Sequence, residues 1–166
     1  MAEQGKAKAK VKAIPDGYHT LTPYISVKGA REALEFYKKA FGAQELFHMD
    51  MPDGRIGHAE MQIGESRFML ADEMPEMPET VSRSPATLGG TTCGFMVYLP
   101  DVDAAFARAV EAGATVKRPV KDQFYGDRSG TIADPFGHVW TLGTHIEDVS
   151  SEEMKRRMEQ LDAGQG

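Results

Sequence analysis

The chain repeats one pattern of secondary structure twice, and this repeat limits the folds open to it. Helical periodicity is expected over residues 29–41 and again over 101–112. Each segment ends at a glycine–alanine pair, Gly42-Ala43 and Gly113-Ala114, where a helix end favours a left-handed residue. A strand precedes each helix and three follow it, so the repeat indicates a duplicated supersecondary unit. We therefore expect an α+β fold of two tandem βαβββ modules, which must associate because each leaves one sheet face bare.

The repeat also sets the expected boundaries. The expected strands are 18–28, 43–50, 56–63 and 66–71 in the first module and 92–99, 115–121, 124–133 and 139–144 in the second. The expected segments are a disordered basic arm (1–17), the first module (18–73), a linker or lid (74–91), the second module (92–147) and a C-terminal helix and tail (148–166). Flexible linker and lid stay open as alternatives for 74–91, where Met74 and Met77 are adaptable contacts.

The segment 124–145 is the most informative single stretch. Asp134-Pro135-Phe136-Gly137 suits a type I turn between two strands, because proline presets φ at its second position and glycine leaves the exit unhindered. Polar residues alternate along the strand before the turn, and Trp140, the only tryptophan, lies on the strand after it. This combination favours the wall of a ligand cavity over a plain core. His138, within the turn region, is expected to be exposed.

Composition excludes several classes of partner. The net charge is −6 and the pI about 5.4, which argues against nucleic acid or an anionic membrane as the main partner. The one cysteine, Cys93, excludes an intramolecular disulfide and suits a reducing compartment. No apolar run reaches the length of a signal peptide core or a membrane-spanning helix. We expect a cytoplasmic protein.

Longer motifs carry a family resemblance over residues 18–160. The modules open with YISVKGAREALEFYKKAFGA and VYLPDVDAAFARAVEAGA, and they contain HAEMQIGESRFMLADE and GDRSGTIADPFGHVWTLGTHIEDVSSEEM. These segments resemble the vicinal oxygen chelate superfamily of glyoxalases, bleomycin-resistance proteins and extradiol dioxygenases, and within it the PhnB-like branch. The resemblance implies curved mixed sheets around a cavity and a homodimer in which modules are sometimes exchanged.

The same resemblance bears on a metal centre. Members with metal chemistry place four His, Glu or Gln ligands on the first and last strands of the modules, because a divalent ion needs several converging N or O donors. The matching positions here are Thr22, Met69, Gly94 (with Cys93 one residue away) and Thr141. None is a competent ligand for such a site, and one thiolate cannot hold the ion. On this argument the usual metal centre is absent, and with it the usual glyoxalase chemistry. We expect no other cofactor.

A displaced metal site is the remaining route to a divalent ion. His58 and Glu60 are two apart on a strand and so share a face, as do His48 and Asp50 on the preceding strand. If both pairs faced inward, two imidazoles and two carboxylates would meet. The alternative is a solvated face or a hydrogen-bonded pocket wall.

The candidate substrate-binding residues are His58, Glu60, Tyr125, Arg128 and Trp140. Arg128 suits an anionic group through its forked donors, or else a salt bridge to a neighbouring strand. Tyr125 and Trp140 suit stacking on a planar ligand, or else the core. His145 precedes Glu147 and Asp148, which would raise its pKa, and a structural role is expected there. No catalytic residue is assigned.

These observations lead to three functional hypotheses. The leading one is a metal-free, small-molecule binding protein of the bleomycin-resistance type. The alternative is a metal-dependent lyase or isomerase of the glyoxalase type, using a displaced site around His58 and Glu60. The third is an interaction protein that uses its basic arm. Whether the protein is an enzyme stays open at this stage.

Overall fold

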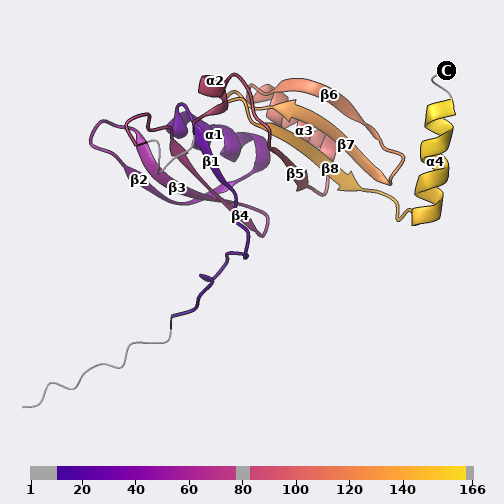
Figure 1. Ribbon diagram of the computed structural model, residues 1–166, viewed down its shortest axis with the longest axis horizontal. Helices are drawn as coiled ribbons and strands as arrows, with labels where there is room; N and C mark the ends of the chain where they lie inside the picture. Colours follow the sequence, from indigo (N-terminus) through magenta and orange to yellow (C-terminus); the bar gives the residue numbers. More distant parts are fainter. Residues whose placement is uncertain (1–10, 78–82, 164–166) are drawn as a thin grey trace, which may run out of the picture.

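The computed structural model describes residues 11–77 and 83–163 and contains two modules of the same topology (Figure 1). The first consists of β1 (Tyr24–Val27), α1 (Ala30–Phe41), β2 (Gln44–Asp50), β3 (Ile56–Ile63) and β4 (Ser66–Asp72). Its sheet has the strand order β1-β4-β3-β2, with β1 parallel to β4 and the other pairs antiparallel. The expected βαβββ module is confirmed.

The second module repeats this arrangement. It consists of β5 (Gly94–Tyr98), α3 (Val102–Glu111), β6 (Thr115–Asp122), β7 (Asp127–Ala133) and β8 (Val139–His145), in the order β5-β8-β7-β6. A short helix, α2 (Pro85–Leu88), lies between the modules, and α4 (Ser151–Ala163) follows the second one. The fold class is therefore α+β with two mixed sheets, and neither sheet closes into a barrel.

The largest departures from the predicted strand bounds are the late starts of β1 and β7. β1 begins at Tyr24 rather than at residue 18, and the preceding segment instead contacts β3, where the Tyr18 hydroxyl donates to Glu60. β7 begins at Asp127 because Gly126 has a φ of 98°, and a Cβ at that position would collide with the carbonyl oxygen of Glu147. The chain therefore turns at Gly126 before it can enter the ladder.

One hydrophobic core serves both modules. Helices α1 and α3 pack on each other and cover one face of each sheet, so that the modules lie side by side (Figure 1). Trp140 is at the centre, with its ring 4.9 Å from Phe41 and 4.7 Å from Phe95 between centroids. Since Phe41 belongs to the first module and Phe95 to the second, the modules share their apolar contacts rather than each enclosing a separate core.

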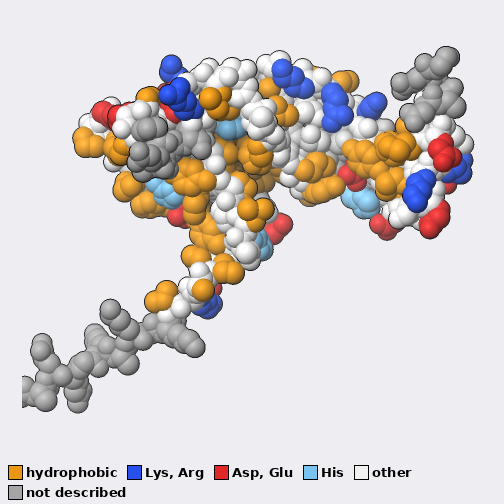
Figure 2. Space-filling view, in the orientation of Figure 1, with side chains coloured by type: hydrophobic (Ala, Val, Ile, Leu, Met, Phe, Trp, Pro, Cys, Tyr) orange, Lys and Arg blue, Asp and Glu red, His pale blue; other side chains and the backbone are white. Residues whose placement is uncertain are grey.

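No helix or strand of the described residues covers the opposite face of each sheet, although the segment around Tyr18 contacts the first one. These two surfaces, called the open faces below, carry several exposed large side chains, and apolar side chains are prominent along the body in Figure 2. Helix α4 stands at the far end of the second module (Figure 1), tied to it by Arg157, which donates to Glu147 and to the carbonyl oxygen of Phe124. No helix formed by the described residues is long and apolar enough to cross a membrane.

Candidate functional site

The open face of the second sheet combines recessed polar groups with protruding apolar ones. Asp127, Ser129 and Thr131 alternate along β7 and are 4%, 1% and 6% exposed. Met96 and Tyr98 on β5 are 42% and 62% exposed, and they lie in the rows opposite Thr141 and Gly143. A solvated sheet face shows the reverse, with polar groups outward. Exposed large apolar side chains grouped in this way are typical of interaction surfaces.

A carboxylate at one end of this face organises two other titratable groups. Asp127 Oδ2 accepts a hydrogen bond of 2.9 Å from the Tyr98 hydroxyl, and Asp127 Oδ1 accepts one of 2.8 Å from His145 Nδ1. His145 Nε2 lies 3.0 Å from Asp148 Oδ1. Since carboxylates only accept, the charged imidazole, with a proton on each ring nitrogen, is the form that satisfies both contacts. Asp127 first, and Asp148 second, raise the pKa of His145, and Asp127 also raises the pKa of Tyr98.

Hydroxyl groups continue the polar row toward the sheet edge. Thr131 Oγ1 lies 3.1 Å from Thr141 Oγ1 and accepts from Arg118 Nε and Nη2 at 3.2 and 3.0 Å. The Tyr125 hydroxyl lies 3.4 Å from Ser129 Oγ. Together with Asp127 and His145, these groups offer donors, acceptors and a transferable proton to a molecule held against the sheet.

The open face of the first sheet carries a second polar cluster. The His58 Nε2 atom lies 3.4 Å from Glu60 Oε1, and His58 Nδ1 lies 3.1 Å from the Tyr24 hydroxyl. Glu60 also accepts from Tyr18, and this hydrogen bond is the main cause that lowers the pKa of Glu60. Arg67 stacks over the Tyr18 ring at 4.8 Å and donates to the Asp16 carbonyl. The segment around Tyr18 is thus tied onto the face.

The structure places the five candidate residues in three different environments. His58 and Glu60 share the open face of the first sheet, and Tyr125 stands beside the open face of the second. Arg128 and Trp140 instead lie on the helix-covered side, so neither reaches an open face. Trp140 is 3% exposed and donates through Nε1 to Asp134 at 2.8 Å. Trp140 therefore takes the core position, which was the alternative to stacking on a ligand.

Arg128 forms the salt bridge that was its alternative interpretation. Its Nε and Nη2 donate to the two carboxylate oxygens of Asp103 on α3, both at 2.7 Å, and its Nη1 donates to Asp122 at 2.8 Å. The side-chain period of a strand explains the error: Asp127 and Arg128 are adjacent, so they face opposite sides of the sheet. Arg128 ties α3 to β7, and its neighbour Asp127 is the residue on the open face.

The donor set does not fit a metal centre. Met69 is paired with Tyr24, Thr141 with Met96, and Thr22 precedes the first strand, so the positions implied by the resemblance bring no imidazole or carboxylate together. The displaced site does not form either, because His48 and Asp50 are paired with Ala59 and Ile56, on the face opposite His58. Within 11–77 and 83–163, no three His, Cys, Asp or Glu side chains are grouped closely enough for an ion.

Several residues of these faces were missed by sequence reasoning. Tyr98 and Tyr24 look like ordinary strand aromatics, and Asp127 looks like one polar residue among many. The only available signal was the alternation of Asp127, Ser129 and Thr131, which placed them on one face without showing which one. His145 was expected to take its raised pKa from Glu147 and Asp148, whereas its nearest partner is Asp127, across the β7–β8 ladder.

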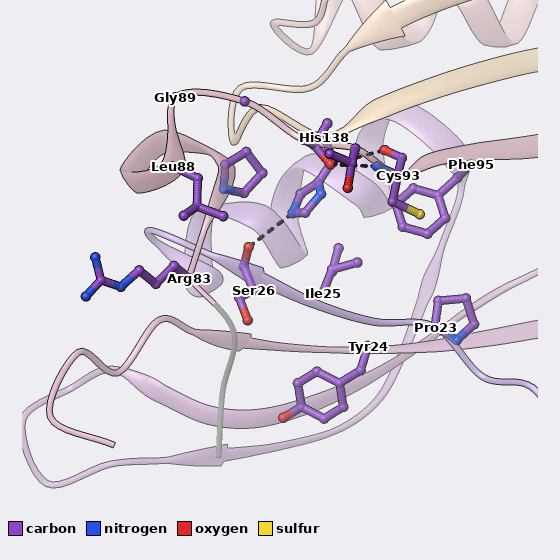
Figure 3. A pocket seen from close by; sticks show the side chains of 14 residues that line it. Pro23, Tyr24, Ile25, Ser26, Arg83, Leu88, Gly89, Cys93, Phe95 and His138 are labelled. Carbon is purple, nitrogen blue, oxygen red and sulfur yellow. Dashed lines mark hydrogen bonds between the residues drawn. The ribbon is translucent and has the colours of Figure 1, made fainter. Parts of the chain in front are cut away.

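A pocket of about 550 Å³ lies at the seam between the modules (Figure 3). We call it the seam pocket; β1, the segment 83–93, β5 and His138 form its walls. His138 is only 6% exposed, in contrast to the expected exposure. Its backbone N–H donates to Asp134 Oδ1 at 2.9 Å and its Nε2 donates to the Ser26 carbonyl at 3.1 Å. The turn therefore aims the ring at the free edge of β1.

Comparison with known proteins agrees with this architecture. The family model for the Glyoxalase/Bleomycin resistance protein/Dioxygenase superfamily matches residues 18–142. Protein Mb0911c of Mycobacterium bovis is 44% identical over 138 residues, covering 83% of this chain and 91% of that protein. Protein At5g48480 of Arabidopsis thaliana is 32% identical over 138 residues, covering 77% and 81%. The crystal structure of TioX from Micromonospora sp. ML1 is 26% identical, with a TM-score of 0.59 and coverage of 80% and 100%.

The fold, the repeated modules and the family match lead to the same assignment. The match covers most of both modules and includes the turn after β7 and the first residues of β8. The chain belongs to the Glyoxalase/Bleomycin resistance protein/Dioxygenase superfamily.

Proposed function

We propose that this protein binds a small organic molecule against the open faces of its sheets, without a metal ion. The proposal rests on the second open face, where polar side chains are buried and large apolar side chains are exposed, the reverse of a solvated sheet face. Three buried polar side chains on β7 share this face with the exposed side chains of Met96 and Tyr98, and the Tyr98 hydroxyl donates to one of them, Asp127. Apolar walls with a few polar anchors are typical of small-molecule sites.

The residues have distinct roles in this proposal. On the second face, Asp127 and the charged His145 anchor polar groups of the ligand, and Ser129 and Tyr125 provide hydroxyls. Met96 adapts its shape to the ligand, as methionine does at binding surfaces. Gly143 provides the room for this, since a Cβ there would lie 2.5 Å from Met96 Cε. His58 and Glu60 on the first face are the second set of anchors.

We further propose that the protein is a homodimer in which the partner copy covers the open faces. Tyr24, Phe47, Met49, Met96 and Tyr98 are exposed there, and such groups of large apolar side chains mark interaction surfaces. Self-complementary pairing is the commonest way to cover them. Sedimentation equilibrium tests this directly: a monomer at micromolar concentration would contradict it.

A ligand screen with matched variants tests the binding proposal. Thermal shift selects compounds that raise the melting temperature, and calorimetry then measures their affinity. Asp127→Asn should weaken binding about tenfold or more, because it removes a charged acceptor and loosens His145. Arg128→Gln is the matched control, since Arg128 is the next residue on β7 and faces α3. Equal effects of the two variants would contradict the assignment of the open face.

The alternative of a glyoxalase-type lyase or isomerase is supported by the contact between His58 and Glu60, a pair able to move a proton. A turnover assay of the same compounds distinguishes it. Product formation that is abolished by His58→Ala would make the protein an enzyme, and dependence of that turnover on an added divalent ion would contradict the metal-free proposal. Saturable binding without turnover favours a binding protein.

We also place the chain in the PhnB-like branch and in the cytoplasm. The first rests on the sequence motifs of the two modules and on the structural likeness to a PhnB protein of Bacillus cereus, which at 17% identity concerns the fold. The second rests on the single, exposed cysteine, which suits a reducing compartment. Fractionation of the source cells tests the location.

A further inference from the structure

We propose that the seam pocket, which is bordered on one side by Tyr24 of the first open face, is a second ligand site for a small amphipathic organic acid that carries an N–H or O–H donor. The pocket is lined by both modules and by the segment that joins them. The residues that line it are Pro23, Tyr24, Ile25, Ser26, Arg83, Pro85, Leu88, Gly89, Gly90, Thr91, Thr92, Cys93, Phe95 and His138. A volume of about 550 Å³ is typical of small-molecule sites.

His138 provides the anchor for the donor. Its Nε2 faces the Ser26 carbonyl, which only accepts, so Nε2 carries a proton. His138 is 6% exposed, yet no described residue hydrogen-bonds to Nδ1, and no fully buried side-chain nitrogen or oxygen in the described chain is without a partner. Nδ1 is therefore reachable from the pocket. In the neutral ring it is an acceptor, held in place by the Ser26 contact.

The charge of the walls favours an anion. The chain has a net charge of −6, but no aspartate or glutamate lines the pocket among the described residues. Arg83 stands at its rim, and it takes part in none of the ion pairs between described residues. A guanidinium at the mouth is positioned for a carboxylate or sulfonate on a ligand whose body lies deeper.

The remaining walls suit an apolar, planar body. Figure 3 shows Leu88 and Arg83 on one side of the pocket and Cys93 and Phe95 on the other, with His138 between them. The wall carrying Leu88 is fixed by Glu73, which accepts from the Thr87 hydroxyl at 2.6 Å and from the Ser84 backbone N–H at 2.9 Å. α2 is thereby held over the pocket. Phe95 also contacts Trp140, which couples the pocket to a fluorescent core residue.

A pair of dyes tests the site. 8-Anilinonaphthalene-1-sulfonate has two aromatic parts, one N–H donor and one anionic group, and N-phenyl-1-naphthylamine has the same skeleton without the anion. Arg83→Gln should weaken binding of the sulfonate about fivefold and leave the neutral dye unchanged, as expected for one solvent-exposed charge pair. The exposed position of Arg83 makes loss of folding no explanation for this result.

Cys93 locates the dye, because it is the only thiol and lines the pocket. The bound sulfonate dye should slow alkylation of Cys93 by iodoacetamide. Prior reaction with N-ethylmaleimide, which forms a thioether between Sγ and the maleimide carbon, should abolish dye binding. Cys93→Ser should bind the dye before and after the same treatment.

The outcomes separate this site from the open faces. Dye binding without protection of Cys93, or equal loss of both dyes in Arg83→Gln, overturns the proposal. Binding that Asp127→Asn weakens and Arg83→Gln leaves intact places the dye on the open face and overturns it too. Failure of the open-face ligand screen, in contrast, has no bearing on Cys93 protection, so the two proposals fail independently.

Discussion

Tyr37 on α1 donates its phenol hydrogen to Asp134 Oδ2, across 2.8 Å, and so joins the first module to the turn after β7 in the second. Both residues are buried, and Asp134 also accepts from Trp140 Nε1 and from the backbone N–H groups of Phe136 and His138. Burial, and then the charge of Asp134, raise the pKa of Tyr37 well above its usual value. The Asp134 carboxylate thus stabilises the turn, orients the core tryptophan and links the two modules.

Tyr37→Phe should lower the free energy of unfolding by about 2 kcal/mol, because it removes a buried hydrogen bond to a charged acceptor while the ring still fills its site. Urea unfolding followed by Trp140 fluorescence measures the change. Tyr125→Phe is the control, with an expected loss below about 0.5 kcal/mol, since its hydroxyl has only a 3.4 Å contact. A loss for Tyr37→Phe no larger than the control would contradict the role of this bond.

Asp72→Asn should destabilise the first module by about 3 kcal/mol. The buried carboxylate of Asp72 accepts from the backbone N–H groups of Gly29 and Ala30 at the start of α1 and of Ile56 at the start of β3. An amide presents only one acceptor oxygen, so at least one N–H loses its partner. The midpoint of chemical unfolding measures this. Asp53→Asn, in an exposed turn, should leave the midpoint almost unchanged.

Asp127→Asn should bring the pKa of His145 down toward 6.5, because Asp127 is the largest cause of its elevation. The wild-type ring is charged in the folded state at a pH where the unfolded chain has lost its proton. Its contribution to stability is therefore full below about pH 6.5 and fades as the pH rises through the folded pKa. NMR titration of the His145 ring gives the pKa, and Asp148→Asn should shift it less. No downward shift in Asp127→Asn would refute the pairing.

Tyr18→Phe should raise the pKa of Glu60 toward 4.5, since the Tyr18 hydroxyl is the main group that holds it low. In the wild type, the contribution of Glu60 to stability is present above about pH 4.5 and is lost as the pH falls through the folded pKa. Carbon-detected NMR of the Glu60 carboxyl follows the titration. Tyr24→Phe is the matched control, because Tyr24 contacts His58 rather than Glu60; an equal shift in both variants would rule out the specific contact.

The fold could be predicted from the sequence because the patterns that indicate its helices, strands and turns are local and occur twice. Glycine ends the first helix in a left-handed conformation at Gly42, as its position after Phe41 predicted, and period-2 alternation located β3 and β4 almost to the residue. The Asp134-to-Gly137 turn likewise closes with a hydrogen bond from the Gly137 N–H to the Asp134 carbonyl, 3.1 Å long. Helix ends, strand periods and tight turns depend on neighbours within a few residues.

The candidate site was harder to predict from the sequence, because alternation shows which residues share a face but not what covers that face. Arg128 and Asp127 could exchange roles on sequence grounds, and only the packing of α3 on one side of β7 assigns Arg128 to a salt bridge and Asp127 to the open face. The same limit applies to Trp140. Its strand was predicted, but its burial depends on Phe41 and Phe95, which are about 99 and 45 residues away in the chain. His138 is buried because its turn packs beside β1. These two segments meet only in the folded chain, so the sequence pattern did not predict the burial.

The amino-acid sequence by itself therefore determined the helices and strands, their order along the chain and the two-module architecture. Each of these follows from short-range sterics and from the periodicity of hydrophobic residues. The tertiary structure decided which sheet faces stay open, which polar groups meet across strands and where the modules leave a pocket. These depend on contacts between residues far apart in the chain, such as Tyr37 with Asp134 and Ser26 with His138, and no local pattern encodes the partner of such a contact.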